Sequence, residues 1–296
     1  MVLPSYLKKG DTVAIIATAR KVSKEEIQPA VAFFESYGLC VVLGKNLFES
    51  SNQYAGTDAQ RTEDLQWALN DKTIKAIIIA RGGYGSVRTI EQIDFTEFKK
   101  HPKWMVGYSD VTVLHNAIHK IGVATLHATM PLNFTKNEEA TKSMVDALFD
   151  KLIQIETEEN YSNISGTAKG QLVGGNLSLI YSLSGTPFDI DTTNKILFIE
   201  DLDEYLYHID RMMMQLKLSG KLKGLKGLIV GGMTDMKDNA IPFGKFPEDI
   251  ILDAVKEYNY PVCFDFPAGH IDRNLAMYFG REVELTVSDN ATLKFL

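Results

Sequence analysis

The chain of 296 residues contains only two cysteines, Cys40 and Cys263. Each lies in an apolar run typical of a strand, and neither has the spacing of a metal-ligand pair. We therefore expect two buried thiols in the reduced state. This scarcity excludes a fold held together by disulfides.

Long apolar runs and a surplus of positive charge are also missing. No run approaches the ~18 apolar residues of a membrane span, and Asp11 interrupts the N-terminal segment before a secretory signal can form. The 31 basic and 38 acidic side chains give a net charge of −7, unlike a nucleic-acid-binding protein. The pairs Lys8-Lys9 and Lys99-Lys100 are typical of solvated surface, although an acidic average leaves room for a local basic pocket. We expect a cytoplasmic protein, unless the chain is a mature form trimmed of its signal, with neither a nucleic acid nor a membrane as partner.

The composition is otherwise that of a globular protein, with 45% hydrophobic and 23% charged residues. In the first half, short apolar runs alternate with helical patterns, and cap signatures at Ser23 and Thr57 open two of the helices. The expected strands cover residues 13–17, 39–43, 75–80, 104–107 and 123–126. Such alternation predicts a mostly parallel sheet with helices on both faces.

The composition changes between Pro131 and Lys169, where Asn, Thr, Glu and Ser dominate around one short helix near 141–152. We predict a domain over residues 1–135, a linker over 136–168 and a second domain over 169–296. The second domain should contain strands at 196–199, 227–230 and 262–264, helices at 206–218 and 247–258, and a C-terminal hairpin at 283–296. The predicted class is α/β: a parallel α/β domain followed by a β-rich α+β domain.

The most informative segment is Gly107-Tyr108-Ser109-Asp110, which lies between an apolar run and a helical pattern. A strand, a tight turn with one serine, and a helix form the geometry that raises a nucleophilic hydroxyl above a sheet edge. Gly107 can adopt the backbone angles that such a turn needs. The first helix amides, beginning with that of Asp110, would face a negative charge near Ser109. A plain helix cap is the alternative for this segment.

Another strand end carries three glycines, Gly82, Gly83 and Gly85. Parallel sheets bind ligands at the carboxyl ends of their strands, and glycines let backbone amides approach an anion closely. The loop has neither the GxGxxG fingerprint nor the lysine of a P-loop. Taken alone, it predicts either a binding loop or a flexible turn.

A nucleophilic serine needs a base, and the chain has six histidines. His270 follows an apolar strand in a loop where Gly269 permits a tight turn, so it is well placed to meet a serine on another element. His127, at the end of a strand, is its competitor, and we favour His270. His115 and His119 lie four residues apart on one helix face, but no third metal ligand accompanies them.

The base also needs an acid that fixes its tautomer. Glu200 follows four apolar residues and should therefore have a fixed position, although a buried carboxylate requires a partner. A structural carboxylate at a strand end is the alternative. Asp201, Asp203 and Glu204 crowd nearby as surface charge or metal ligands, but their spacing matches no EF-hand. We predict no metal site.

Together these segments resemble the L,D-carboxypeptidase family of serine peptidases, which also includes the microcin-immunity type. The resemblance extends from Val13 to about Leu285, with the motifs in the family's order. The motifs are Arg81-Gly82-Gly83-Tyr84-Gly85, Gly107-Tyr108-Ser109-Asp110, Gly174-Gly175-Asn176, Phe198-Ile199-Glu200-Asp201, Ile209-Asp210-Arg211-Met212 and Gly269-His270.

The resemblance implies an N-terminal amidotransferase-like α/β domain and a C-terminal β-rich domain. It implies a triad of Ser109, Glu200 and His270, with an oxyanion hole formed by the backbone amides of Gly83 and Asp110. The family's usual activity is release of the terminal D-alanine from cytoplasmic murein tetrapeptides. Such a triad needs no metal and no organic cofactor.

The substrate contacts are harder to locate, and the candidates are Arg81, Tyr84, Asn176 and Arg211. An arginine suits the free carboxylate of a peptide terminus. Because the chain has no long insertion, we favour the murein-recycling branch over the microcin-immunity branch, which would cleave a peptidyl-nucleotide amide. A non-catalytic module that binds a phosphate ligand is a further alternative. The sequence leaves the oligomeric state open, a homodimer included.

Overall fold

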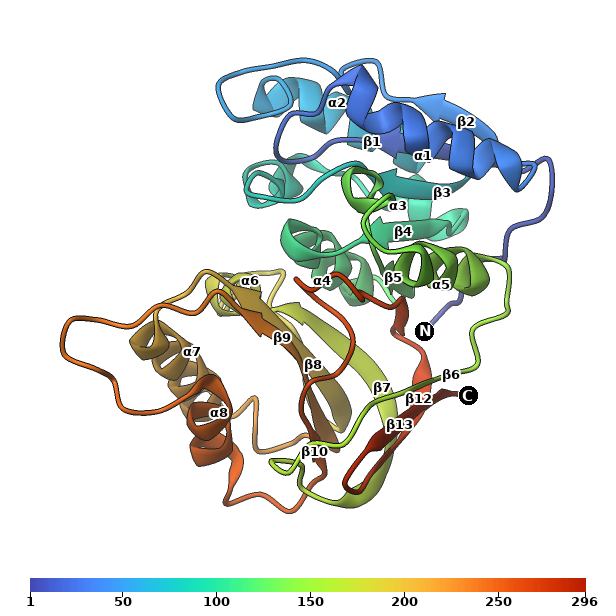
Figure 1. The fold of residues 1–296 in the computed structure, drawn as a ribbon. Helices are drawn as coiled ribbons and strands as arrows, with labels where there is room; N and C mark the ends of the chain where they lie inside the picture. The colour runs from blue at the N-terminus through green and yellow to red at the C-terminus, as the bar shows by residue number, and fades with distance from the viewer. The chain divides into compact units, whose positions relative to one another are not determined.

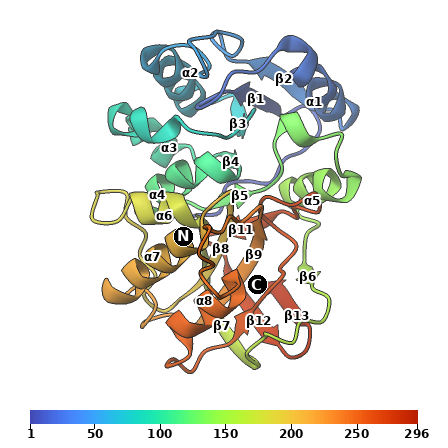
Figure 2. The ribbon, with the colours of Figure 1, turned by 60° about the vertical axis from the view of Figure 1, so that its left-hand side comes forward.

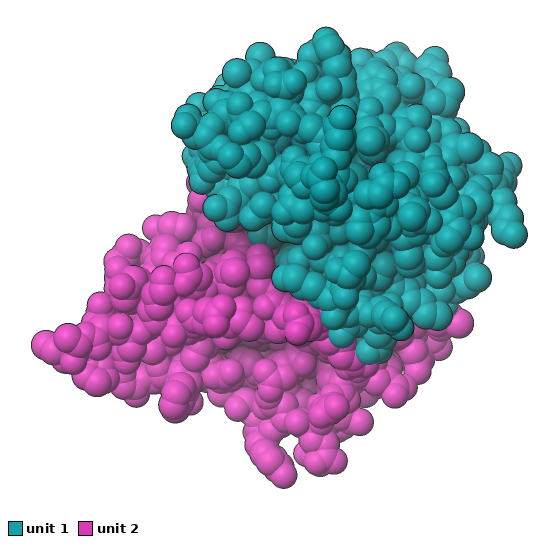
Figure 3. All heavy atoms as spheres, turned by 45° about the horizontal axis from the view of Figure 1, so that its top comes forward, with its two compact units in different colours: residues 1–152, 275–280 teal, residues 153–274, 281–296 magenta.

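A computed structural model describes residues 1–296. The chain forms two compact units, each with one sheet. Unit 1 comprises residues 1–152 and 275–280, and unit 2 comprises residues 153–274 and 281–296 (Figure 3). No helix is both long enough and apolar enough to cross a membrane.

Unit 1 contains a six-stranded sheet in the order β11-β5-β4-β3-β1-β2. Five strands run parallel, and β11 pairs antiparallel with β5. The strands are β1 (Thr12–Ile16), β2 (Cys40–Leu43), β3 (Ile74–Ile79), β4 (Trp104–Gly107), β5 (Thr125–His127) and β11 (Met277–Phe279). The helices are α1 (Lys24–Ser36), α2 (Asp58–Asn70), α3 (Thr96–Lys100), α4 (Thr112–Lys120) and α5 (Glu138–Leu148), with 3-10 turns η1 (Ser86–Arg88), η2 (Ile90–Gln92), η3 (Ser109–Val111) and η4 (Pro131–Asn133).

Helices cover both faces of this sheet, as the sequence predicts. Figure 2 shows α1 and α5 on one side of the strands and α2, α3 and α4 on the other. Every residue of β4 is buried. Both predicted capping boxes are present: Ser23 and Thr57 accept hydrogen bonds from the amides of Glu26 and Gln60, whose side chains bond back to the cap amides. These local signals start α1 and α2 at their predicted positions.

Unit 2 contains a mixed seven-stranded sheet in the order β10-β9-β8-β7-β12-β13-β6 (Figure 1). The first four strands in that order run parallel, and the other three join antiparallel. The strands are β6 (Gln154–Glu156), β7 (Gly166–Asn176), β8 (Lys195–Leu202), β9 (Gly227–Thr234), β10 (Val262–Cys263), β12 (Glu282–Val287) and β13 (Ala291–Phe295). The helices α6 (Leu177–Ser182), α7 (Leu206–Leu218) and α8 (Pro247–Val255) share a buried apolar core with the parallel strands. The predicted class, a parallel α/β domain followed by a β-rich α+β domain, is confirmed.

The structure and the sequence divide the chain differently. The predicted linker, residues 136–168, contains helix α5, which belongs to unit 1, and strand β6, which belongs to unit 2. The chain also returns to unit 1 at residues 275–280, where β11 extends the first sheet. The pattern missed this return because a three-residue strand carries no periodicity of its own.

The two cysteines have different environments. Cys263 is fully buried, and burial, followed by the charge of Asp265, raises the pKa of its thiol to about 12. Cys40 is exposed, so its predicted burial is wrong. Strand β2 is the last strand at its end of the sheet, and its four side chains are exposed or half-buried.

Candidate active site

The serine-bearing turn of unit 1 has a strained backbone. Strand β4 ends at Gly107, and Ser109 adopts φ +64 before α4 begins at Thr112. This left-handed conformation costs a residue with a side chain about 1–2 kcal/mol. A side chain at Gly107 would place its Cβ 2.8 Å from Val111 Cγ2, so the turn requires glycine there. The predicted strand, tight turn and helix are thus present, and they carry the strain that a plain helix cap does not need.

The glycine loop that follows β3 lies against this serine. A Cβ atom at Gly82 would lie 3.0 Å from Ser109 Cβ and 3.1 Å from Ser109 Oγ. Gly83, the next residue, adopts φ +114. The loop therefore approaches the hydroxyl closely because it has no side chain at Gly82, and it brings the Gly83 backbone to the same place.

The side chain of Asp110 holds this loop. Its carboxylate accepts hydrogen bonds from the amide of Ser86 at 2.8 Å and from the amide of Gly85 at 3.3 Å. Burial raises the pKa of Asp110, and these hydrogen bonds offset only part of that effect. The side chain of Asp110 thereby fixes the loop, while its backbone amide lies at the start of the turn–helix segment after Ser109.

A histidine–carboxylate pair lies in unit 2. His270 Nδ1 is 2.6 Å from Glu200 Oε2, and the backbone amide of His270 donates to the same oxygen at 3.0 Å. Glu200 is fully buried. Gly269, at φ +104, permits this approach, because a Cβ there would lie 2.7 Å from Glu200 Cβ. Sequence separates the two partners by 70 residues, and the fold brings them into direct contact.

The charge of this pair favours an imidazolium. Burial lowers the pKa of His270, but the charge and hydrogen bond of Glu200, with the charge of Asp201, outweigh burial and raise the pKa above its usual range. The carboxylate of Glu200 also keeps the proton of a neutral imidazole on Nδ1, so that Nε2 is the atom that can accept a proton.

Asp201 is buried, so its predicted place among surface charges is wrong. Strand β8 continues through Glu200 and Asp201 to Leu202, with a register irregularity against β9 between Ile199 and Asp201. The carboxylate of Asp201 accepts hydrogen bonds from Asn176 Nδ2 at 2.8 Å and from the amides of Ser178 and Leu202. Burial, followed by the charge of Glu200, raises the pKa of Asp201 to about 7.

The four candidate substrate contacts lie in different settings. Tyr84 is 48% exposed on the glycine loop, next to Gly83. Arg81 lies at the start of this loop and donates from Nη1 to the carbonyl of Lys21 at 3.3 Å. Asn176 caps α6 and bonds to Asp201. The guanidinium of Arg211 lies 5.2 Å from the ring centroid of Tyr207 on α7.

Two histidines of unit 1, His127 and His115, lie behind the serine turn. His127 is fully buried and packs its ring against Tyr108 and Phe279. His115 Nε2 lies 3.0 Å from the carbonyl oxygen of Gly107, and burial lowers the pKa of His115 to about 4. A neutral His115 can donate to that carbonyl. This role was not predicted, although the spacing of eight residues from Gly107 to a helical histidine could have indicated it.

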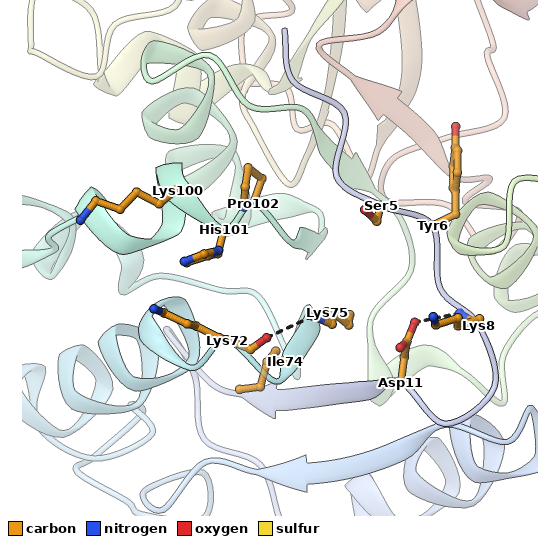
Figure 4. Close-up of a pocket in the computed structure, with 10 residues that line it drawn as sticks. All are labelled: Ser5, Tyr6, Lys8, Asp11, Lys72, Ile74, Lys75, Lys100, His101 and Pro102. Atoms are coloured by element: carbon orange, nitrogen blue, oxygen red, sulfur yellow. Dashed lines mark hydrogen bonds between the residues drawn. The ribbon is translucent and has the colours of Figure 1, made fainter.

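Unit 1 also has a basic cavity of about 480 Å³, which lies at the other end of the strands from the glycine loop (Figure 4). Ile74 and Lys75 place it at the amino end of β3, whereas the glycine loop follows the carboxyl end. The lining residues are Ser5, Tyr6, Lys8, Asp11, Lys72, Ile74, Lys75, Lys100, His101 and Pro102. Lys8 and Lys100, one from each isolated lysine pair, thus share one cavity, which is separate from the serine turn.

A strained serine beside a glycine loop and a buried histidine–carboxylate pair are the parts from which serine hydrolases are built. Comparisons with known proteins agree. The model of the LD-carboxypeptidase N-terminal domain matches residues 13–128, and that of the LD-carboxypeptidase C-terminal domain matches residues 169–285. The chain belongs to the LD-carboxypeptidase family and is a serine-type carboxypeptidase.

Individual relatives cover nearly the whole chain. The probable murein peptide carboxypeptidase of Bacillus subtilis is 37% identical over 98% of this chain and 93% of its own length. The crystal structure of muramoyltetrapeptide carboxypeptidase from Oxalobacter formigenes superposes with a TM-score of 0.87 at 26% identity, covering 96% of this chain and 98% of that one. The microcin C7 self-immunity protein MccF shares the fold, with a TM-score of 0.88 at 19% identity over 100% of this chain and 99% of its own.

Proposed function

We propose that this protein is a serine L,D-carboxypeptidase that releases the terminal D-alanine from murein tetrapeptides. The observation that carries the proposal is the left-handed backbone of Ser109 at the end of β4, with the glycine loop against its side chain. Family membership supports the reaction class, and the names of the relatives from B. subtilis and O. formigenes support the substrate class.

In the first step, His270 takes the proton of Ser109 through Nε2 as the oxygen attacks the scissile carbonyl carbon. Glu200 holds the imidazole through Nδ1 and stabilises the positive charge that forms. The amides of Gly83 and Asp110 receive the negative charge on the carbonyl oxygen. Each such donor contributes about 3–4 kcal/mol to stabilising the transition state.

In the second step, the imidazolium of His270 donates its proton to the leaving amine, and D-alanine departs. A water molecule, deprotonated by the same imidazole, then hydrolyses the acyl-enzyme and restores Ser109. All protons pass through His270, so the cycle needs neither a metal nor an organic cofactor.

Tyr84, Arg81, Asn176 and Arg211 are proposed to contact the peptide. Tyr84 has the strongest support, because its half-exposed ring lies on the loop that contains Gly83. Arg81 lies on the same loop. Asn176 donates a hydrogen bond to Asp201, which is the residue next to Glu200 in the sequence. Arg211 has the least support, because its guanidinium already lies over Tyr207.

The decisive experiment is mass spectrometry of murein tripeptide, tetrapeptide and pentapeptide after incubation with the protein. We expect loss of one alanine from the tetrapeptide alone, and no loss with Ser109→Ala. An intact tetrapeptide would contradict the proposal. An aminoacyl sulfamoyl nucleotide is tested in parallel, and its exclusive cleavage would assign the microcin-immunity reaction instead.

A substrate of murein turnover implies a cytoplasmic place and a soluble peptide partner. We therefore propose a cytoplasmic enzyme, to be checked by cell fractionation with an antibody against the chain. A homodimer is proposed for its assembly, and light scattering after size-exclusion chromatography tests it against the 33.0 kDa mass of one chain.

A further inference from the structure

The loop after β1 carries an arginine, Arg20, that the motifs do not include. Strand β1 pairs with β3, with Ile16 opposite Ile79, so the loops that follow these two strands are neighbours. The amide of Arg20 donates to the carbonyl of Gly82 at 3.4 Å. The β1 loop is thus attached directly to the glycine loop.

The side chain of Arg20 lies over Gly83. A Cβ atom at Gly83 would lie 2.3 Å from Arg20 Cδ and 2.4 Å from Arg20 Cγ. On the preceding residue, a Cβ at Gly82 would lie 3.1 Å from Ser109 Oγ. Ser109 therefore packs against Gly82, and the stem of Arg20 packs against the next residue, Gly83. Arg20 borders the residue whose amide is proposed to bind the oxyanion.

The guanidinium of Arg20 is available for a ligand. It is exposed and forms no ion pair, hydrogen bond or ring contact with another side chain. The neighbouring arginines are engaged: Arg61 and Arg88 share Asp58, and Arg81 donates to the Lys21 carbonyl. An arginine keeps its charge at any physiological pH, and its planar fork matches a carboxylate through two parallel hydrogen bonds.

The chemistry of the substrate favours a carboxylate-binding cation at this place. In a peptide cleaved before its last residue, the terminal carboxylate carbon is only three bonds from the scissile carbonyl carbon. A group that binds this carboxylate must therefore lie beside the oxyanion site. We propose that Arg20 binds the free C-terminal carboxylate of the peptide and so restricts cleavage to the last residue; the inference rests on the function proposed above.

The test compares two substrates that differ only at the terminus: the murein tetrapeptide with a free carboxylate, and the same peptide with a C-terminal amide. We expect the wild-type protein to prefer the free acid. Arg20→Gln should lower kcat/KM for the acid by about 10- to 100-fold, mainly through KM, because it removes charge-assisted hydrogen bonds to the substrate. Activity on the amide should change by less than about two-fold in the same variant.

Two further variants separate charge from geometry. Lys21→Gln removes the same charge from the adjacent residue, whose ammonium contacts only Ser50, and should leave both substrates unaffected. Arg20→Lys keeps the charge without the planar fork and should recover part of the preference for the acid. Circular dichroism confirms that each variant is folded.

The outcomes distinguish the inference from the function on which it rests. Suppose that the wild-type protein cleaves the acid, that Ser109→Ala does not, and that Arg20→Gln prefers the acid over the amide as strongly as the wild type. The role proposed for Arg20 is then rejected, and the proposed function stands. An equal loss on acid and amide also rejects the role, because it indicates a structural effect. If the wild-type protein cleaves neither peptide, the function and the inference fall together.

Discussion

The contact between Gly269 and Glu200 allows a quantitative prediction for Gly269→Ala. The added Cβ would lie 2.7 Å from Glu200 Cβ, and Glu200 is fully buried, so the carboxylate has no free space into which to move. A side chain at φ +104 costs about 1–2 kcal/mol, and overpacking a buried site costs about 1–3 kcal/mol more. We expect a loss of about 2–5 kcal/mol in the free energy of unfolding.

The chain offers a matched control in the same unit. Gly220 also has a left-handed backbone, at φ +78, but a Cβ there would meet no atom within 4 Å. Gly220→Ala should therefore show the conformational cost of about 1–2 kcal/mol alone. The difference between the two variants measures the steric contact with Glu200.

The assay is urea denaturation followed by far-UV circular dichroism, with kcat for D-alanine release measured in parallel. Displacing Glu200 from His270 should reduce kcat by about 100-fold or more in Gly269→Ala, and by less than about two-fold in Gly220→Ala. If Gly269→Ala is as stable as Gly220→Ala, Gly269 does not approach the Glu200 side chain this closely.

Four further predictions concern the chemistry and the stability of the site. Ser109→Ala should keep the fold and lose turnover by several orders of magnitude, as measured by single-turnover kinetics; full activity would remove Ser109 from the mechanism. The raised pKa of His270 places the acidic limb of the pH profile of kcat/KM above pH 6.5, and Glu200→Gln should move it to lower pH, because burial then dominates; an unmoved limb would show that another group titrates. Because folding raises the pKa of His270, the protonated imidazole adds to the free energy of unfolding. This stabilisation is complete below pH 6.5 and is lost as pH rises through the raised pKa. Asp110→Ala removes the acceptor of the Ser86 and Gly85 amides and should cost about 1–3 kcal/mol in urea denaturation; unchanged stability would mean that these hydrogen bonds do not hold the loop.

The serine turn could be predicted because its parts are consecutive. An apolar strand, a glycine, a serine and a helical pattern follow one another within 104–121, and each is a local signal. The capping boxes at Ser23 and Thr57 were predictable for the same reason. Such features depend on backbone preferences and on neighbours within four residues.

Contacts across the fold were not predictable from local pattern. Strand β11 needs β5 as its partner, and the exposure of Cys40 depends on the place of β2 in the sheet. The burial of Asp201 results from the continuation of β8 past Ile199 and from the donors of Asn176 and Ser178. None of these partners lies near its counterpart along the chain.

The alternation of strands and helices, the turn that carries Ser109 and the resemblance to the family could all be read from the amino-acid sequence, because short, contiguous patterns encode them. The contact of His270 with Glu200 beside Gly269, and the packing of the Arg20 stem on Gly83, could be seen only in the folded chain. The cause is steric: Glu200 and Arg20 can approach Gly269 and Gly83 because these glycines have no Cβ atom, and the approach exists only after the sheets have formed.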